Sequence, residues 1–223
     1  MNHDKTEYTE ITRLNDRNKE EWRSTRKLGS LIGDDEDVLR RKQLATAAFR
    51  GLWNLWKRGQ QVSEKLRLYQ AFISPVLLYN SGTWAVTKSA QERLDSFHRR
   101  QLRSLIGIRW PQTISNNALY ARCESQPISH TIKILRWKLF GHVLRLSDST
   151  PAVQAMVSYY TSKDLKGWRG RPRTSLPGTL SADLEAADAG KLSSLEDLHR
   201  IRKIAVDRAE WRALCQRVTE KDL

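Results

Sequence analysis

Residues 88–106 read KSAQERLDSFHRRQLRSLI, and this stretch decides the fold more than any other. Its apolar side chains recur every three or four residues, which is the spacing of one face of an α-helix. Between them, Arg99, Arg100 and Arg103 are expected to point to solvent. We therefore predict an amphipathic helix with a basic outer face. The side chains expected on its buried stripe are Leu94, Phe97, Leu102, Leu105 and Ile106.

Helical spacing also runs through most of the remaining sequence. Residues 34–59 predict one long helix, which begins at acidic residues because the helix dipole favours negative charge at its start. Residues 147–178 are rich in Ser, Thr, Gly and Pro, which is typical of a linker. The expected fold class is therefore mostly α, a helical bundle with a small N-terminal β remnant and a helical C-terminal tail. Further helices are predicted over 115–123, 128–146, 179–188 and 194–218, and short strands over 5–13 and 24–32.

The positive charge of the chain is concentrated in its middle. The whole chain carries a net charge of +14, and residues 38–176 hold 24 Lys and Arg against 6 Asp and Glu. Residues 1–37 hold 7 basic and 10 acidic side chains, and residues 177–223 hold 8 and 9. A basic middle between acidic flanks is typical of a surface that binds a polyanion. Nucleic acid is the partner that we expect, and a generally basic chain without such a surface is the alternative.

Composition narrows the class of protein further. With 39% hydrophobic and 29% charged residues, the chain has the composition of a globular protein. Cys123 and Cys215 are far apart, so no disulfide framework is expected and a reducing compartment fits, that is, an intracellular place in the nucleus or cytoplasm. No apolar run approaches the roughly 20 residues that cross a bilayer, so no membrane partner is expected. Nothing in the sequence indicates a cofactor.

The sharpest local motif is Trp168-Arg169-Gly170-Arg171-Pro172-Arg173. Gly170 allows close approach of the backbone to a ligand, and Pro172 keeps the segment extended. Arginines on such a ribbon fit a narrow A·T minor groove, and the motif resembles the core of an AT-hook. The alternative is a solvated basic linker that contacts phosphates without reading sequence. The candidate nucleic-acid-binding residues of this segment are Lys166, Arg169, Arg171 and Arg173.

A second group of candidate nucleic-acid-binding residues lies on the predicted helices. Arginines form a ladder on and just beyond the helix over 88–106, and further cations follow on the helix over 128–146. Together they are expected to form the wall of a groove that follows a nucleic-acid backbone. An ordinary solvated helix face is the alternative. The group consists of Arg99, Arg100, Arg103, Arg109, Lys133, Arg136, Lys138 and Arg145.

Residue patterns that might serve metal or catalytic chemistry are better explained by structural roles. Cys123, His130 and His142 lack the tight spacing of a zinc finger or knuckle, so core packing or polar capping is expected for His142. Gly33-Asp34-Asp35 resembles a metal-binding aspartate pair of polymerases, but it opens a charged helix and no apolar strand follows. Helix capping is the role that we expect for it. No nucleophile triad or phosphate-binding loop is found.

Several short segments match one family in their order and spacing. They are Lys5-Thr6-Glu7, Lys27-Leu28-Gly29-Ser30 with Asp34-Asp35, residues 68–79 (LYQAFISPVLLY) with Gly82-Thr83-Trp84, residues 97–103 (FHRRQLR) with Ile106-Gly107-Ile108, Arg136-Trp137, residues 141–145 (GHVLR), residues 169–173 (RGRPR), and Asp207-Arg208 with Trp211-Arg212. Together they resemble the reverse transcriptase polyprotein of non-LTR retrotransposons. The resemblance covers most of the chain and begins late in that protein.

The resemblance implies a polymerase thumb that grips template–primer duplex, followed by a C-terminal nucleic-acid-binding region. It also implies that the metal-binding palm aspartates and the fingers would lie before Met1, so that Lys5, which matches a palm lysine, has no reaction to assist. We therefore expect a truncated element or remnant that is not an enzyme by itself. The implied segments are an incomplete palm edge (1–33), a thumb-like helical bundle (34–110), post-thumb helices (111–146), a basic linker (147–178) and C-terminal helices (179–223).

Three functions are open at this point. The first is a non-catalytic nucleic-acid-binding fragment of a retrotransposon reverse transcriptase, an RNA-directed DNA polymerase, which grips duplex or RNA through its basic face. The second is a polymerase part that is active only when another polypeptide supplies the missing palm and fingers. The third is a module whose Trp-rich helices bind another protein. The first is the function that we expect.

Overall fold

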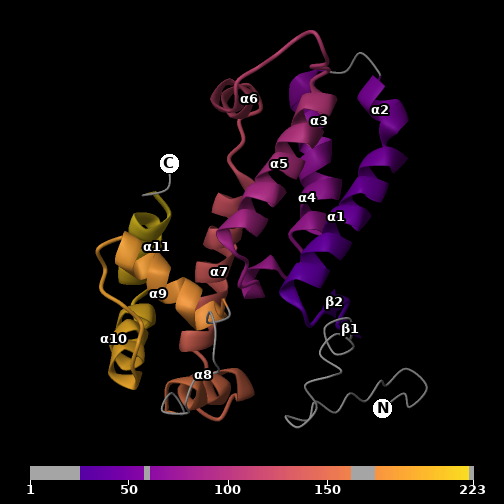
Figure 1. Ribbon diagram of the computed structural model, residues 1–223. Coiled ribbons are helices and arrows are strands. Elements are labelled where there is room, and N and C mark those ends of the chain that lie inside the picture. Colours follow the sequence, from indigo (N-terminus) through magenta and orange to yellow (C-terminus); the bar gives the residue numbers. More distant parts are fainter. Residues whose placement is uncertain (1–25, 58–60, 162–173, 221–223) are drawn as a thin grey trace, which may run out of the picture. The chain divides into compact units, whose positions relative to one another are not determined.

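The computed structural model describes residues 26–57, 61–161 and 174–220 (Figure 1). Helices hold most of these residues, which confirms the mostly α fold class. The chain divides into two compact units. Unit 1 takes the described residues up to Asn80 together with Gln101–Thr113, and unit 2 takes Ser81–Arg100 together with the described residues from Ile114 onward. The five-segment division expected from the sequence stays a prediction.

Unit 1 begins with a β-hairpin. Strands β1 (Arg26–Lys27) and β2 (Ser30–Leu31) pair antiparallel, with Arg26 opposite Leu31. The two residues between them, Leu28 and Gly29, have φ values of 49° and 83°. A two-residue turn of this hand matches the twist of the strands, and glycine adopts it without strain. The strand predicted over 24–32 is thus a small hairpin, whereas the one predicted over 5–13 lies outside the described residues.

An arginine of the first helix holds this hairpin in place. Helix α1 (Asp34–Gly51) presents Arg41, whose Nη2 donates to Ser30 Oγ at 3.1 Å and whose guanidinium lies 4.2 Å from the centre of the Tyr79 ring. The Tyr79 hydroxyl donates to the Leu28 carbonyl at 2.7 Å. Asp37, in the first turn of α1, accepts from the Leu31 amide at 2.9 Å and so binds the backbone of the hairpin. The helix cap residue itself is Gly33, which offers no capping side chain.

The single long helix predicted over 34–59 is broken at Leu52, where ψ is 12°. Helix α1 ends at Gly51, and helix α2 (Trp53–Lys57) begins after this one residue. The Trp56 indole donates to the Phe49 carbonyl at 2.7 Å and stacks on the Phe49 ring with centroids 5.2 Å apart. The two tryptophans of α2 have different surroundings, since Trp56 is buried and Trp53 is half-buried.

The remaining helices of unit 1 complete its core. Helix α3 (Val62–Leu68) continues into a π-helical turn, η3 (Tyr69–Ile73), directly before α4 (Ser74–Leu77). Pro75 stands in the first turn of α4, and a proline cannot donate the backbone hydrogen bond of an ordinary α-helix. The Tyr69 hydroxyl donates to Gln101 Oε1 at 2.6 Å, and both side chains are buried. Gln101 opens the last turn of helix α5 (Lys88–Leu105), which unit 1 shares with unit 2.

Unit 2 is built around one long helix, α7 (Ile128–Leu144). It contacts the short turn η4 (Ser81–Thr83) and helices α8 (Pro151–Thr161), α10 (Leu195–Val206) and α11 (Arg208–Glu220), as Figure 1 shows. Helix α6 (Asn116–Arg122) begins at Ser115, whose hydroxyl accepts from the Ala118 amide. The apolar core centres on side chains of α7 and α9 (Leu176–Ala186) together with those of α10 and α11. Its largest members are Trp137, Phe140, Tyr160, Leu184, Ile201 and Trp211.

Gly141 allows close contact between helices α7 and α11. A Cβ atom at this position would lie 2.2 Å from the Trp211 indole nitrogen, a separation that no real Cβ contact shows. The glycine of α7 and the tryptophan of α11 therefore fit together only because Gly141 has no side chain. Two segments that matched the family separately, 141–145 and 207–212, are thus packed against each other.

Two secondary-structure predictions for unit 2 are wrong. The segment 147–178, predicted as a linker, contains α8, which buries Val153 and Tyr160. The helix predicted over 194–218 is interrupted at Asp207, where ψ is 115°. The Asp207 carboxylate accepts from the amides of Ala209 at 2.6 Å and Glu210 at 3.2 Å, so this residue ends α10 and caps α11.

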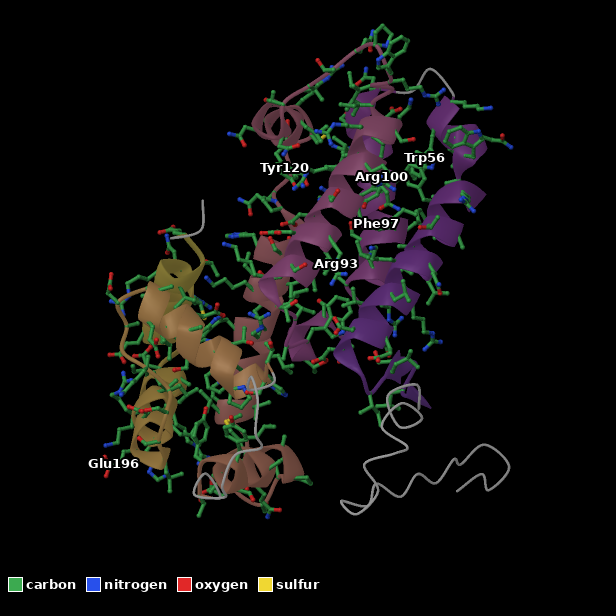
Figure 2. All side chains as sticks on the ribbon, in the orientation of Figure 1. Trp56, Arg93, Phe97, Arg100, Tyr120 and Glu196 are labelled. Atoms are coloured by element: carbon green, nitrogen blue, oxygen red, sulfur yellow. The ribbon has the colours of Figure 1, made fainter. Side chains whose placement is uncertain are left out.

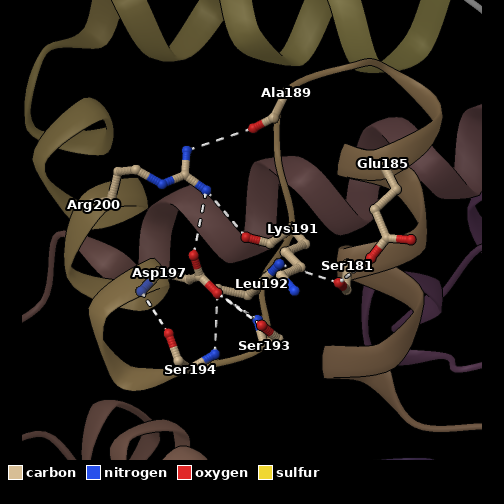
Figure 3. A network of polar contacts seen from close by, with 9 residues as sticks. All are labelled: Ser181, Glu185, Ala189, Lys191, Leu192, Ser193, Ser194, Asp197 and Arg200. Atoms are coloured by element: carbon tan, nitrogen blue, oxygen red, sulfur yellow. Dashed lines mark hydrogen bonds and ion pairs between the residues drawn. The ribbon is translucent and has the colours of Figure 1, made fainter.

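The connection from α9 to α10 is held by a compact polar network (Figure 3). Asp197 accepts from the amides of Ser193 and Ser194 at 2.9 and 3.1 Å, and the Ser194 hydroxyl accepts from the Asp197 amide at 3.1 Å. This reciprocal pair is a capping box for α10. Arg200 pairs with Asp197 and donates to the Lys191 carbonyl. The hydrogen bonds from Ser193 and Ser194 lower the pKa of the Asp197 carboxyl.

Candidate nucleic-acid interface

The part of α5 that belongs to unit 2 carries an exposed basic stripe. Arg93, Phe97 and Arg100 are spaced at i, i+4 and i+7, which places them on one side of the helix. Figure 2 shows these three side chains following one another along α5. Both arginines are exposed and the Phe97 ring is half-buried between them. The opposite side of the helix is buried through Leu94 and His98, so the stripe has a fixed orientation within unit 2.

Arg99 lies at the edge of this stripe and is held by α6. Its Nη1 donates to the Tyr120 hydroxyl at 3.5 Å, and the Tyr120 ring lies 6.1 Å from the His98 ring. Burial lowers the pKa of His98 to about 4, against the opposing effect of Asp95. His98 is therefore neutral at physiological pH, and the positive charge at this place comes from the arginines.

Helix α7 carries a second exposed stripe. Lys138, His142 and Arg145 are again spaced at i, i+4 and i+7, and all three are exposed. Arg145 Nη1 donates to the Ala205 carbonyl of α10 at 3.2 Å, which fixes the guanidinium at the end of α7. The core packing expected for His142 is thus wrong, because the residue is exposed, while the polar capping role stays a prediction.

Residues 81–146 have few carboxylates to balance these cations. Asp95 is half-buried and accepts from the Ser129 amide and hydroxyl at 3.0 and 2.7 Å, so it is committed to the start of α7. The exposed carboxylates of this segment are Glu92 and Glu124. The residues that follow, 174–220, hold 7 basic and 8 acidic side chains and have no such excess. The exposed cations that residues 81–146 contribute to unit 2, which we call the α5–α7 basic set, are Lys88, Arg93, Arg100, Arg122, Lys138 and Arg145.

Two of the predicted binding residues, Lys133 and Arg136, belong to the interior instead. Their exposed fractions are 7% and 2%, and their cationic groups lie 3.6 and 3.2 Å from the Asp183 carboxylate. Arg136 Nη2 also donates to the Trp84 carbonyl at 3.3 Å, and the Trp137 indole donates to Asp183 at 3.0 Å. The expectation that Lys133 and Arg136 line an exposed basic face is therefore wrong. They neutralise a carboxylate inside unit 2.

The last two predicted residues on the helices, Arg103 and Arg109, lie in unit 1. Arg103 is half-buried in the final turn of α5. Arg109 is exposed, and its guanidinium lies 5.9 Å from the centre of the Trp53 ring. The candidates Lys166, Arg169, Arg171 and Arg173, with the arginine-rich motif, lie outside the described residues.

Sequence reasoning missed three members of the α5–α7 basic set: Lys88, Arg93 and Arg122. The helical spacing of α5 could have found Arg93, since it stands seven residues before Arg100. Nothing comparable marks Arg122, whose exposure depends on how α6 packs. In the described part of the chain no cluster of three metal-ligating side chains occurs, and Cys123 and His130 are buried while His142 is exposed. Nor is any described helix long and apolar enough to cross a membrane.

Comparison with known proteins gives one informative match. A Caenorhabditis elegans protein described as transposon-derived is 24% identical to this chain over 187 residues. The aligned stretch covers 82% of this chain and 65% of that protein, so the chain spans less than two thirds of the length of its relative. No protein-family profile matches the chain, and no solved structure matches it significantly. The similarity points to a transposon-related origin.

Proposed function

We propose that this chain is a non-catalytic nucleic-acid-binding module of a retrotransposon reverse transcriptase, and that it holds duplex or RNA through phosphate contacts. The observation that carries the proposal is the α5–α7 basic set. Six exposed cations stand there against two exposed carboxylates, on helices of unit 2 that each also carry buried side chains. Cations on rigid helices suit the binding of a phosphate backbone, since phosphate contacts supply most of the sequence-independent affinity for nucleic acids.

The origin of the chain supports the same function. The relative described as transposon-derived agrees with the segments that resemble a reverse transcriptase. In this proposal the chain acts in the nucleus or cytoplasm, where it meets nucleic acid. The proposal includes that the chain does not transfer nucleotides by itself. The position of Asp34 and Asp35, the pair nearest to a polymerase motif, in the first turn of α1 supports this part of the proposal.

The burial of most described tryptophans makes a protein-binding module a weaker proposal for the main function. Of the six tryptophans in the described residues, four are buried: Trp56, Trp84, Trp137 and Trp211. Their rings fill the cores of the two units and are not available to a partner. Trp53 is half-buried, and Trp110 is exposed.

The test is the salt dependence of binding. We expect the purified chain to bind fluorescently labelled duplex DNA and RNA in an anisotropy titration, with log K falling linearly as log salt rises. If all six exposed cations contacted phosphates of a duplex, the slope would reach about −5, since each contact contributes about −0.9. An affinity that is equal at low and high salt, or no binding at low salt, would contradict the proposal.

A further inference from the structure

Trp110 is the most exposed large apolar side chain in the described part of the chain, with 92% of its surface open to solvent. An indole in water is unusual because its ring is large and apolar. The four buried tryptophans show that the fold has core positions for this side chain, and Trp110 does not occupy one. The ring is therefore available to a binding partner.

The backbone before Trp110 is fixed by the end of α5. The amide of Gly107 donates to the Ser104 carbonyl at 3.3 Å, and the amide of Ile108 donates to the Arg103 carbonyl at 2.9 Å. This pair of bonds is the Schellman motif that ends many helices, and it requires the positive φ that Gly107 adopts, 79°. The chain thus leaves α5 in one defined direction.

A tight turn then presents the indole. The Gln112 amide donates to the Arg109 carbonyl at 2.8 Å, which closes a four-residue turn with Trp110 as its second residue. Because the helix end before the turn and the turn itself are hydrogen-bonded, Trp110 is displayed on a short ordered loop of unit 1.

Cations gather beside this loop. Arg109 lies 5.9 Å from the centre of the Trp53 ring, and Lys57 Nζ lies 5.3 Å from the same centre. Trp53 is half-buried at the start of α2, so its ring brings Lys57 close to Arg109, the residue directly before Trp110. Residues 101–113, which end α5 and form the loop, contain two arginines and no carboxylate.

We propose that Trp110 stacks on an unpaired nucleobase while Arg109 and Lys57 contact the neighbouring phosphates. An exposed aromatic ring beside cations is the arrangement with which proteins hold single-stranded nucleic acid, since every base has a π-face and every nucleotide a phosphate. A partner protein surface would gain from the indole as well, but the cations favour a polyanion. This inference rests on the proposed function and adds to it a preference for single-stranded ends.

The experiment compares a blunt RNA–DNA duplex with the same duplex carrying a short single-stranded overhang, both titrated against the full chain at one salt concentration. Loss of one base–aromatic stack weakens binding about tenfold. Trp110→Ala is expected to lose that factor on the overhang substrate and to leave the blunt duplex unchanged. Trp110→Phe is expected to keep most of the affinity. Phe72→Ala is the matched control, because Phe72 is also an exposed aromatic residue of unit 1, with 57% exposure.

A second readout reports stacking directly. With 2-aminopurine in the overhang, the wild-type chain is expected to quench its fluorescence on binding, and Trp110→Ala is expected not to. The inference is overturned if Trp110→Ala binds the overhang as tightly as the wild type, or if it weakens both substrates equally. If the wild type binds the blunt duplex with the expected salt dependence, such a result leaves the proposed function standing. If the wild type binds neither substrate, both proposals fail.

Discussion

Removal of the Asp183 carboxylate is expected to cost more stability than removal of any single cation beside it. Asp183 lies 3.6 Å from Lys133 Nζ and 3.2 Å from Arg136 Nη1, and it accepts from the Trp137 indole. Asp183→Ala removes the carboxylate that both interior cations contact. Lys133→Met removes one charge, keeps the aliphatic chain and leaves Arg136 paired with Asp183.

The magnitudes follow from the burial of the partners. Breaking a buried pair so that an uncompensated charge stays inside costs about 3–5 kcal/mol, whereas replacing a buried ion by an apolar side chain of similar volume is often neutral. With Lys133 and Arg136 only 7% and 2% exposed, we expect Asp183→Ala to lie in that range. Lys133→Met is expected to change the free energy of unfolding by about 1 kcal/mol or less. Lys138→Met, on the exposed stripe of the same helix, is expected to stay within about 0.5 kcal/mol.

Urea unfolding followed by tryptophan fluorescence measures these differences, since Trp137 belongs to the network. The interior position of Lys133 and the exposed position of Lys138 also predict how the two variants bind nucleic acid. Lys133→Met is expected to leave the salt slope of binding unchanged, and Lys138→Met is expected to reduce it by about 1. A Lys133→Met variant that loses slope while Asp183→Ala unfolds like the wild type would refute the assignment of Lys133 to the interior.

Two further predictions concern packing and acid stability. Gly141→Ala is expected to destabilise the chain by about 1–3 kcal/mol in thermal or urea unfolding, because its Cβ would meet the Trp211 indole at 2.2 Å. Gly51→Ala, where a Cβ meets nothing within 4 Å, is expected to be neutral or to stabilise by up to about 1 kcal/mol, and equal effects of the two variants would contradict the close contact. Because hydrogen bonds from Ser193 and Ser194 lower the pKa of Asp197 in the folded chain, its stabilising contribution is complete above the unfolded pKa of about 4 and is lost as pH falls through the folded pKa. Unfolding measured from pH 7 to pH 3 should therefore show a shallower loss of stability for Asp197→Asn than for the wild type, and identical profiles would exclude this contribution.

The sequence predicted the helices that rest on a regular apolar stripe. Helix α5 runs over Lys88–Leu105, close to the predicted 88–106, because Leu94, Leu102 and Leu105 fill one side of it. The break at Leu52 could not be predicted, because it depends on the stacking of Trp56 on Phe49 after the chain has turned. The break at Asp207 could have been found, because an aspartate followed three residues later by Glu210 is a helix-start signal.

The residues of the candidate site also fall into those that helical spacing could place and those that it could not. Arg99 and Arg100 stand opposite a clear apolar stripe, so their place at the surface followed from helical spacing. Helix α7 is packed on more than one side, so periodicity could not separate its exposed Lys138 from its buried Lys133 and Arg136. The residue that decides their role, Asp183, is 47 positions from Arg136 in the sequence. No local pattern indicates such a partner.

The most direct test of the account asks whether affinity depends on where the positive charge lies. Arg93→Ala with Arg100→Ala removes two exposed arginines from the α5–α7 basic set, and Arg208→Ala with Arg217→Ala removes two exposed arginines from α11. Both double variants have the same net charge. Salt titrations of duplex binding are expected to show a slope smaller by about 1.8 for the α5 variant, since two phosphate contacts are lost, and an unchanged slope for the α11 variant. Equal slopes for the two variants would contradict a basic surface on α5–α7.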